Sequence, residues 1–320
     1  MMHPTTGLHH VTAVAGDPQA NLDFYAGRLG LRLVKRTVNF DDPGTYHFYY
    51  GDRTGRPGTL LTFFPWAGMR RGRRGPGETS LVSFSVPATA LGFWEDRLGA
   101  AGIVTGRAER FGVTRLRFSD PDGLALELAG DGEPGTGGLW DQAGIPAEAA
   151  IRRFSSVTLQ LRSTEATRAV VTDVLGLVPG PVDGAIQRFD PVGGGLGGVE
   201  LRQDETGAVA FGAGSIHHIA WRAAGQEHQL QLRGEVLGQG LGVTPVVDRT
   251  YFRSIYFREP GGVLFEVATD DPGFLVDEAE RELGHGLKLP PQYEGERAAI
   301  EAVLPPIRVP GTDVVTVEGQ

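Results

Sequence analysis

Four apolar segments with the length and character of strands recur along the chain, and a helix is expected after each of them. They span residues 8–14, 80–86, 154–161 and 216–221. A Leu-Gly pair follows at 29–30, 98–99, 175–176 and 237–238. Glycine suits the residue just past a helix, where the backbone often turns left-handed, so each pair is expected to close its helix. Asp17 and Pro18 are good start signals for the first helix.

Further strands and turns follow each helix. In the first repeat they are predicted at 31–38, 46–50 and 59–64, and in the fourth at 243–248, 252–258 and 263–268. Each repeat is therefore a βαβββ module, and the chain has four of them, numbered in chain order. One unit is too small to close its own core, so the sequence predicts an α+β fold in which four βαβββ modules pair into two domains with curved sheets. The expected limits are 1–137 and 138–270, with a C-terminal extension at 271–320 that has a helix near 294–303.

Composition narrows the function. The chain has 320 residues, 40% of them hydrophobic, which excludes a disordered chain. No run approaches the ~18 apolar residues of a membrane span, and the first seven residues lack the layout of a signal peptide, so we expect a cytoplasmic protein without a membrane partner. Cysteine is absent, which excludes thiol and iron–sulfur chemistry. A net charge of −9 argues against nucleic acid as a partner.

Histidines mark equivalent places in two repeats. Two pairs, His9–His10 and His217–His218, lie in the first strands of repeats one and four. Neighbours on a strand point to opposite faces, so one member of each pair can enter a shared site. The second member lies 19 residues before the leucine of its Leu-Gly pair in both repeats, which selects His10 and His218. Repeat three has Ser156 there. A shared site requires modules one and four to pack together, and modules two and three to form a half without metal.

A carboxylate completes the candidate site. Glu266 lies among apolar residues in the last strand of repeat four, where an unpaired acid is costly to bury. Glu127 occupies the same place in repeat two, but without a histidine, and is interpreted as an inert counterpart. Counting from the turn proline, the equivalent of repeat one is Phe63, which leaves no fourth protein ligand. Two histidines and one carboxylate are typical of non-haem Fe(II) oxygenases, with Zn(II) and Mn(II) as alternatives.

Three more residues are candidates around this set. In the hairpin at Pro260, Tyr256 is expected to face Glu266, either to bond a substrate oxygen or as ordinary strand packing. Thr12 shares the face of His10. Arg249 is a candidate for binding substrate charge, with an exposed surface position as the alternative. The neighbours of His47 favour core packing.

With these residues in hand, the chain resembles the vicinal oxygen chelate superfamily, which contains glyoxalase I and the extradiol dioxygenases. Within it, the chain is most similar to the hydroquinone ring-cleaving dioxygenases such as 2,6-dichlorohydroquinone dioxygenase. The resemblance runs from about Gly7 to Pro305 and rests on several motifs: 8–12 (LHHVT), 34–37 (VKRT), 46–50 (YHFYY), 216–218 (IHH), 251–252 (YF), 260–266 (PGGVLFE) and 287–293 (LKLPPQY).

That resemblance implies a metal-dependent ring-cleaving dioxygenase of the extradiol type acting on a hydroquinone or catechol. It implies iron at His10, His218 and Glu266, and a Tyr256 that contacts the substrate oxygen. Arg249, Thr12, His9 and His217 would belong to the hydrogen-bonded layer that orients the ligands. The partners would be a small aromatic diol and dioxygen, and a homo-oligomer stays open. The alternatives are a glyoxalase-type metal-dependent isomerase or lyase and a non-catalytic protein that binds aromatic compounds.

Overall fold

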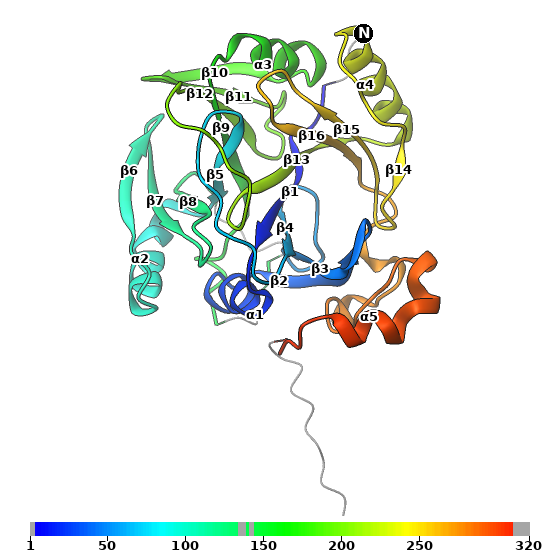
Figure 1. Ribbon diagram of the computed structural model, residues 1–320. Helices are drawn as coiled ribbons and strands as arrows, with labels where there is room; N and C mark the ends of the chain where they lie inside the picture. The colour runs from blue at the N-terminus through cyan, green and yellow to red at the C-terminus, as the bar shows by residue number, and fades with distance from the viewer. Residues whose placement is uncertain (1–3, 134–138, 141–143, 310–320) are drawn as a thin grey trace, which may run out of the picture.

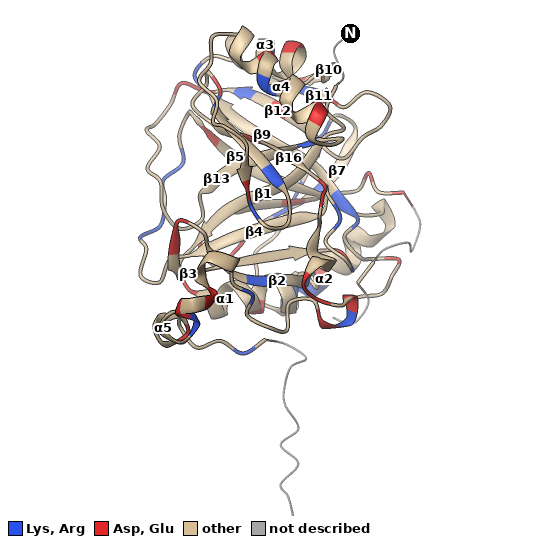
Figure 2. Cartoon of the chain, turned by 90° about the vertical axis from the view of Figure 1, so that its right-hand side faces the viewer, with Lys and Arg blue, Asp and Glu red and all other residues tan. Residues whose placement is uncertain are grey.

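Two curved sheets of eight strands each form the molecule, on the right and left of Figure 1. The structure is a computed structural model that describes residues 4–133, 139–140 and 144–309. Short helices lie at the periphery of the sheets (Figure 1). Buried apolar side chains from both sheets belong to one continuous core. Acidic and basic positions are scattered along the chain (Figure 2).

The first sheet combines modules one and four from opposite ends of the repeat, and the second combines the consecutive modules two and three. Strand β1 (Leu8–Ala15) of module one runs antiparallel to β13 (Ile216–Ala223) of module four. Strand β5 (Glu78–Ser85) of module two pairs in the same way with β9 (Arg153–Leu161) of module three. The predicted curved sheets are confirmed, and so is the pairing of module one with module four. Each sheet draws on both sequence domains. The predicted boundary at 137–138 lies outside the described residues, so the domain limits stay a prediction.

The four modules share one strand pattern. The first sheet has the order β14 (Val247–Asp248), β15 (Arg253–Arg258), β16 (Leu264–Thr269), β13, β1, β4 (Leu60–Pro65), β3 (Asp42–Gly51) and β2 (Arg32–Asn39). The second has the order β10 (Val178–Asp183), β11 (Ile186–Asp190), β12 (Gly198–Gln203), β9, β5, β8 (Ala125–Ala129), β7 (Val113–Ser119) and β6 (Gly106–Arg110). In every module the first and last strands are parallel neighbours. Equivalent residues of different modules therefore meet equivalent partners.

One predicted strand is much shorter than expected. The segment 243–248 contains only β14 and an isolated bridge between Val243 and Phe257. Pro245 lies between them, and proline has no N–H to donate to a ladder. This edge of the first sheet is therefore an irregular loop.

The first helix begins where the sequence predicts, and Asp17 caps it by accepting from Ala20 N at 2.7 Å. In modules one and three an α-helical turn passes into a π-helical one. These segments are α1 (Pro18–Leu22) with η1 (Asp23–Arg28), and α3 (Glu165–Ala169) with η3 (Val170–Val174). They close at Gly30 and Gly176, whose φ angles are 65° and 70°. For these two modules the Leu-Gly prediction is correct.

In modules two and four the helix also ends at or next to its Leu-Gly pair, but the glycine of the pair is not the left-handed residue. A short 3-10 turn, η2 (Ala88–Ala90), leads into α2 (Leu91–Ala100), and α4 (Gln226–Gly238) is the longer helix of module four. Helix α2 ends one residue past Gly99, and α4 ends at Gly238. The left-handed residues are the next glycines, Gly102 and Gly240, each with φ of 74°.

The C-terminal extension is fastened to module one. It contains η4 (Phe274–Val276), η5 (Glu280–Glu282), η6 (Pro291–Glu296) and α5 (Arg297–Val303), so the predicted tail helix is present in its second half. The buried Lys35 of β2 donates to Asp277 Oδ1 at 2.6 Å, and Tyr46 OH of β3 donates to Pro305 O at 3.0 Å. Across the described residues, no helix combines the length and apolar character needed to span a membrane.

Candidate metal centre

Three buried donor atoms from three adjacent strands meet at one point of the first sheet. His10 of β1 and His218 of β13 approach with their Nε2 atoms 3.3 Å apart. Glu266 Oε2 of β16 lies 3.3 Å from His10 Nε2 and 2.9 Å from His218 Nε2. The exposed fractions of His10, His218 and Glu266 are 2%, 5% and 0%, respectively. The sheet thus brings together the two histidines that the repeat spacing selected and the buried acid expected to join them.

The donor set fits a divalent cation. Two ligand bonds of ~2.1 Å at a right angle place their donor atoms ~3.0 Å apart, close to all three separations. Ser254 donates to Glu266 Oε1, whereas the buried Oε2 accepts no hydrogen bond of good geometry among the described residues. Burial acts to raise the pKa of Glu266, but His10 and His218 outweigh it and hold the pKa well below its usual range. The site therefore presents an ionised carboxylate oxygen to a cation.

The first histidine of each pair lies within hydrogen-bond distance of the second one. His9 Nδ1 lies 2.9 Å from His10 Nδ1, and His217 Nδ1 lies 2.7 Å from His218 Nδ1. Burial, and then the neighbouring ligand histidine, lowers the pKa of both His9 and His217 to about 3, so both rings are neutral. When the ligand histidine carries the proton on Nδ1, its Nε2 lone pair faces the other donors. His9 and His217 thus occupy the orienting positions expected of them.

Replacing His217 with alanine is expected to weaken metal binding roughly 10- to 100-fold, because His218 loses the partner that fixes its ring and tautomer. Competition with a chromophoric chelator measures the affinity. His285→Ala is the matched control, since His285 lies in the extension beside Glu282. Equal affinities for the two variants would show that His217 does not orient the ligand.

Tyr256 and Arg249 form the next part of the site. The register of β15 and β16 pairs Tyr256 directly with Glu266, as the hairpin predicts, and its ring lies 5.8 Å from that of His218. Arg249 Nε donates to Tyr256 OH at 3.0 Å, which leaves the phenol proton available to another acceptor. Burial, followed by Glu266, raises the pKa of Tyr256 and keeps it protonated. Arg249 is partly buried and also lies 3.5 Å from Asp41 Oδ2, so it is not the exposed side chain of the alternative interpretation.

The position equivalent to Glu266 in module one is Thr62, and the prediction of Phe63 is wrong. Strand β4 pairs Thr62 with Thr12, two residues after His10, just as β16 pairs Glu266 with Ala220, two residues after His218. The count from the turn proline fails because the turns differ in length, and a shift by one residue reverses the face. Phe63 points into the core. The conclusion survives, because threonine supplies no carboxylate.

The hydroxyl of Thr62 belongs to a chain of hydrogen bonds with neighbouring side chains. Its Oγ1 lies 2.8 Å from Thr12 Oγ1 and 3.0 Å from His47 Nε2, and His47 Nδ1 lies 2.9 Å from Tyr49 OH. The side chain of Thr12 therefore forms its hydrogen bond with Thr62. The prediction that His47 packs in the core is wrong, because its side chain lines the cavity that opens from the three donor atoms. Strand alternation places His47 and Tyr49 on one face, and only the register of β4 tells which face this is.

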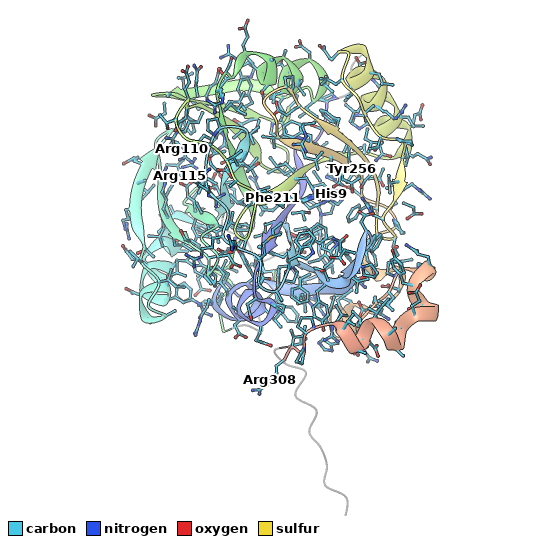
Figure 3. The ribbon with its side chains drawn as sticks, viewed as in Figure 1. His9, Arg110, Arg115, Phe211, Tyr256 and Arg308 are labelled. Carbon is cyan, nitrogen blue, oxygen red and sulfur yellow. The ribbon has the colours of Figure 1, made fainter. Side chains whose placement is uncertain are left out.

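A cavity of about 420 Å³ opens from the donor atoms. We call it the front cavity. Its walls are largely aromatic and its outer part is acidic; apart from residues already named, it is lined by Asn39, Phe40, Asp42, Phe64, Trp66, Phe252 and Leu264. Figure 3 shows Tyr256 and His9 within the right-hand sheet.

The second sheet holds arginine at the corresponding place. Glu127 and Glu200 are fully buried, and Arg110 Nη2 lies 2.9 Å from a carboxylate oxygen of each. Arg115 Nη1 lies 2.6 Å from Glu127 Oε1. Both arginines are labelled in the left half of Figure 3. Guanidinium groups, not histidines, neutralise these carboxylates, which is consistent with the predicted inert role of Glu127.

Comparison with known proteins agrees with this geometry. The family model of the Glyoxalase/Bleomycin resistance protein/Dioxygenase superfamily matches residues 7–128. The chain is 45% identical over 309 residues to "Putative ring-cleaving dioxygenase MhqO" of Bacillus subtilis, covering 97% of this chain and 99% of that one. The chain belongs to the glyoxalase/dioxygenase superfamily.

Other members show how far the likeness extends. Chlorohydroquinone/hydroquinone 1,2-dioxygenase of Sphingobium indicum is 38% identical over 301 residues, with 90% of this chain and 92% of that protein covered. A crystal structure of a "putative dioxygenase" from Bacillus subtilis superposes with a TM-score of 0.92 at 45% identity, covering 96% of this chain and 98% of that one. Glyoxalase I from Zea mays superposes with a TM-score of 0.61 at 12% identity, covering 82% and 92%, which shows a shared fold.

Proposed function

We propose that the chain is a metal-dependent ring-cleaving dioxygenase that acts on a hydroquinone or catechol. The observation that carries the proposal is the set of three donor atoms at the end of an aromatic cavity, with a threonine at the fourth position. Three protein ligands leave positions for both a diol and dioxygen. The relatives named as ring-cleaving dioxygenases support the same reaction class.

The residues fit a bound divalent ion, for which we propose Fe(II), with Mn(II) and Zn(II) as alternatives. When bound, such an ion lowers the pKa of a phenol and, in the case of Fe(II), supplies redox chemistry toward dioxygen. His10, His218 and Glu266 would hold it. His9 and His217 keep the two imidazoles in the required orientation.

Tyr256 has the chemistry to act on the diol. Its phenol is protonated, and Arg249 occupies one lone pair of the hydroxyl oxygen. The remaining proton can be donated to a phenolate oxygen in the front cavity. A donor that is fixed in place stabilises negative charge there at little reorganisation cost. We propose that Tyr256 is a catalytic residue and that Arg249 positions its hydroxyl.

We further propose extradiol-type cleavage. The name of the Sphingobium relative specifies hydroquinone and the 1,2 bond. In a hydroquinone, whose hydroxyls are at carbons 1 and 4, this bond joins one hydroxyl-bearing carbon to one without a hydroxyl. Extradiol cleavage of a catechol also breaks a bond between a carbon that bears a hydroxyl and a neighbouring carbon that does not. The same protein groups can therefore serve either diol.

Oxygen uptake tests the proposal. Protein purified without air, loaded with Fe(II) and given a panel of hydroquinones and catechols should consume one dioxygen per diol, with a ring-opened product. His218→Ala is the control that lacks a ligand. Consumption of no diol in the panel would contradict the proposal. Isomerisation of a hemithioacetal without oxygen uptake would instead identify a glyoxalase-type enzyme.

A further inference from the structure

A second cavity lies behind the pair His9–His10. Its volume is about 180 Å³. Leu60, Phe252 and Phe274 form apolar walls, His9 lies at its inner end, and Leu275 lies at its opening with 53% of its surface exposed. We call it the rear pocket.

Only a thin partition separates the rear pocket from the front cavity. Phe252 lines both. Its ring centroid lies 5.0 Å from that of His10, which faces the front, and 5.3 Å from that of His9, which faces the rear. The rear pocket therefore ends one ring away from a candidate metal ligand.

The apolar walls of the rear pocket suit a small apolar molecule, although Thr54, Tyr251 and two charged residues also belong to its lining. Its two charged lining residues are each paired: Asp270 Oδ1 accepts from Arg222 Nε at 2.8 Å, and Arg56 Nε donates to Asp52 Oδ2 at 2.5 Å. Apolar cavities of ~150 Å³ lined by leucine and phenylalanine stay dry and accept xenon or benzene. A diol would lose the hydrogen bonds that water gives it, which is costly in apolar surroundings. Dioxygen has no such cost.

We propose that the rear pocket takes up dioxygen and passes it beside Phe252 to the candidate metal centre. The inference rests on the dioxygenase function proposed above. A diol held at the donor atoms fills the inner end of the front cavity and obstructs that approach. A separate apolar entrance allows dioxygen to arrive while the diol is in place.

Xenon tests the binding site without any turnover. Crystals of the full chain pressurised with xenon should show the gas between Leu60, Phe252 and Phe274. An empty rear pocket under xenon pressure would overturn the proposal. This measurement still decides the matter if no diol proves to be a substrate, so it separates the two proposals.

Kinetics test the route. Leu275→Trp narrows the opening, and the matched control is Val276→Trp, since Val276 is 55% exposed in the same turn and does not line the rear pocket. Leu275→Trp should raise KM for dioxygen about five- to tenfold and leave KM for the diol and the metal content unchanged. The control should match wild type. An unchanged oxygen KM in Leu275→Trp, or an equal rise in the diol KM, would show that the pocket is not an oxygen route.

Discussion

His218→Ala is expected to lose its metal during purification. A four-ligand zinc site binds with ~10–16 kcal/mol, or about 3 kcal/mol for each ligand, so loss of one ligand weakens binding by roughly 100-fold or more. The vacated space also leaves Glu266 Oε2 with a single imidazole neighbour, His10. Metal content per chain, measured by elemental analysis after anaerobic purification, gives the result directly. His10→Ala should behave in the same way.

The second sheet supplies the control for this experiment. Glu127 is a fully buried carboxylate at the place equivalent to Glu266, but its neighbours are arginines. Glu127→Gln should therefore retain wild-type metal content, and thermal unfolding checks that the variant is folded. Normal metal content in His218→Ala would rule out the assigned ligand set.

The two histidines of the candidate metal centre were predictable because they follow from a repeat. His10 and His218 have the same distance to their Leu-Gly pairs, and the structure gives both the same place beside a parallel last strand. Glu266 was recognisable because an acid in an apolar strand needs a partner. The requirement for a shared site also predicted which modules form one sheet, which local patterns do not reveal.

The errors arose where one residue decides the face or the end of an element. Thr62 and Phe63 differ by one position, and only the pairing of β1 with β4 shows which of them faces the site. His47 lies in a strand of aromatic residues that resembles a core strand on both faces. After Gly99 and Gly238 a second glycine follows within a few residues, and that second glycine takes the left-handed conformation.

Long-range charge pairing was also hidden from the sequence. Arg110 and Arg115 are on neighbouring strands β6 and β7, where arginine normally indicates a solvated face. The structure instead buries both against Glu127 and Glu200, which come from two other strands. Glu200 belongs to a different module, so its pairing with these arginines becomes visible only once the second sheet is assembled.

Tyr256→Phe is expected to keep its fold and its metal but to turn over an aromatic diol roughly ten- to a hundredfold more slowly. A hydrogen bond to a charged oxygen is worth about 1.5–3 kcal/mol, and phenylalanine removes this donor while filling nearly the same volume. Tyr46→Phe is the matched control, because the Tyr46 hydroxyl donates to Pro305 O in the extension and takes no part in the site. Steady-state oxygen uptake, measured on wild type and both variants at equal metal content, separates the two roles. Equal rates for Tyr256→Phe and wild type would mean that Tyr256 only packs beside Glu266.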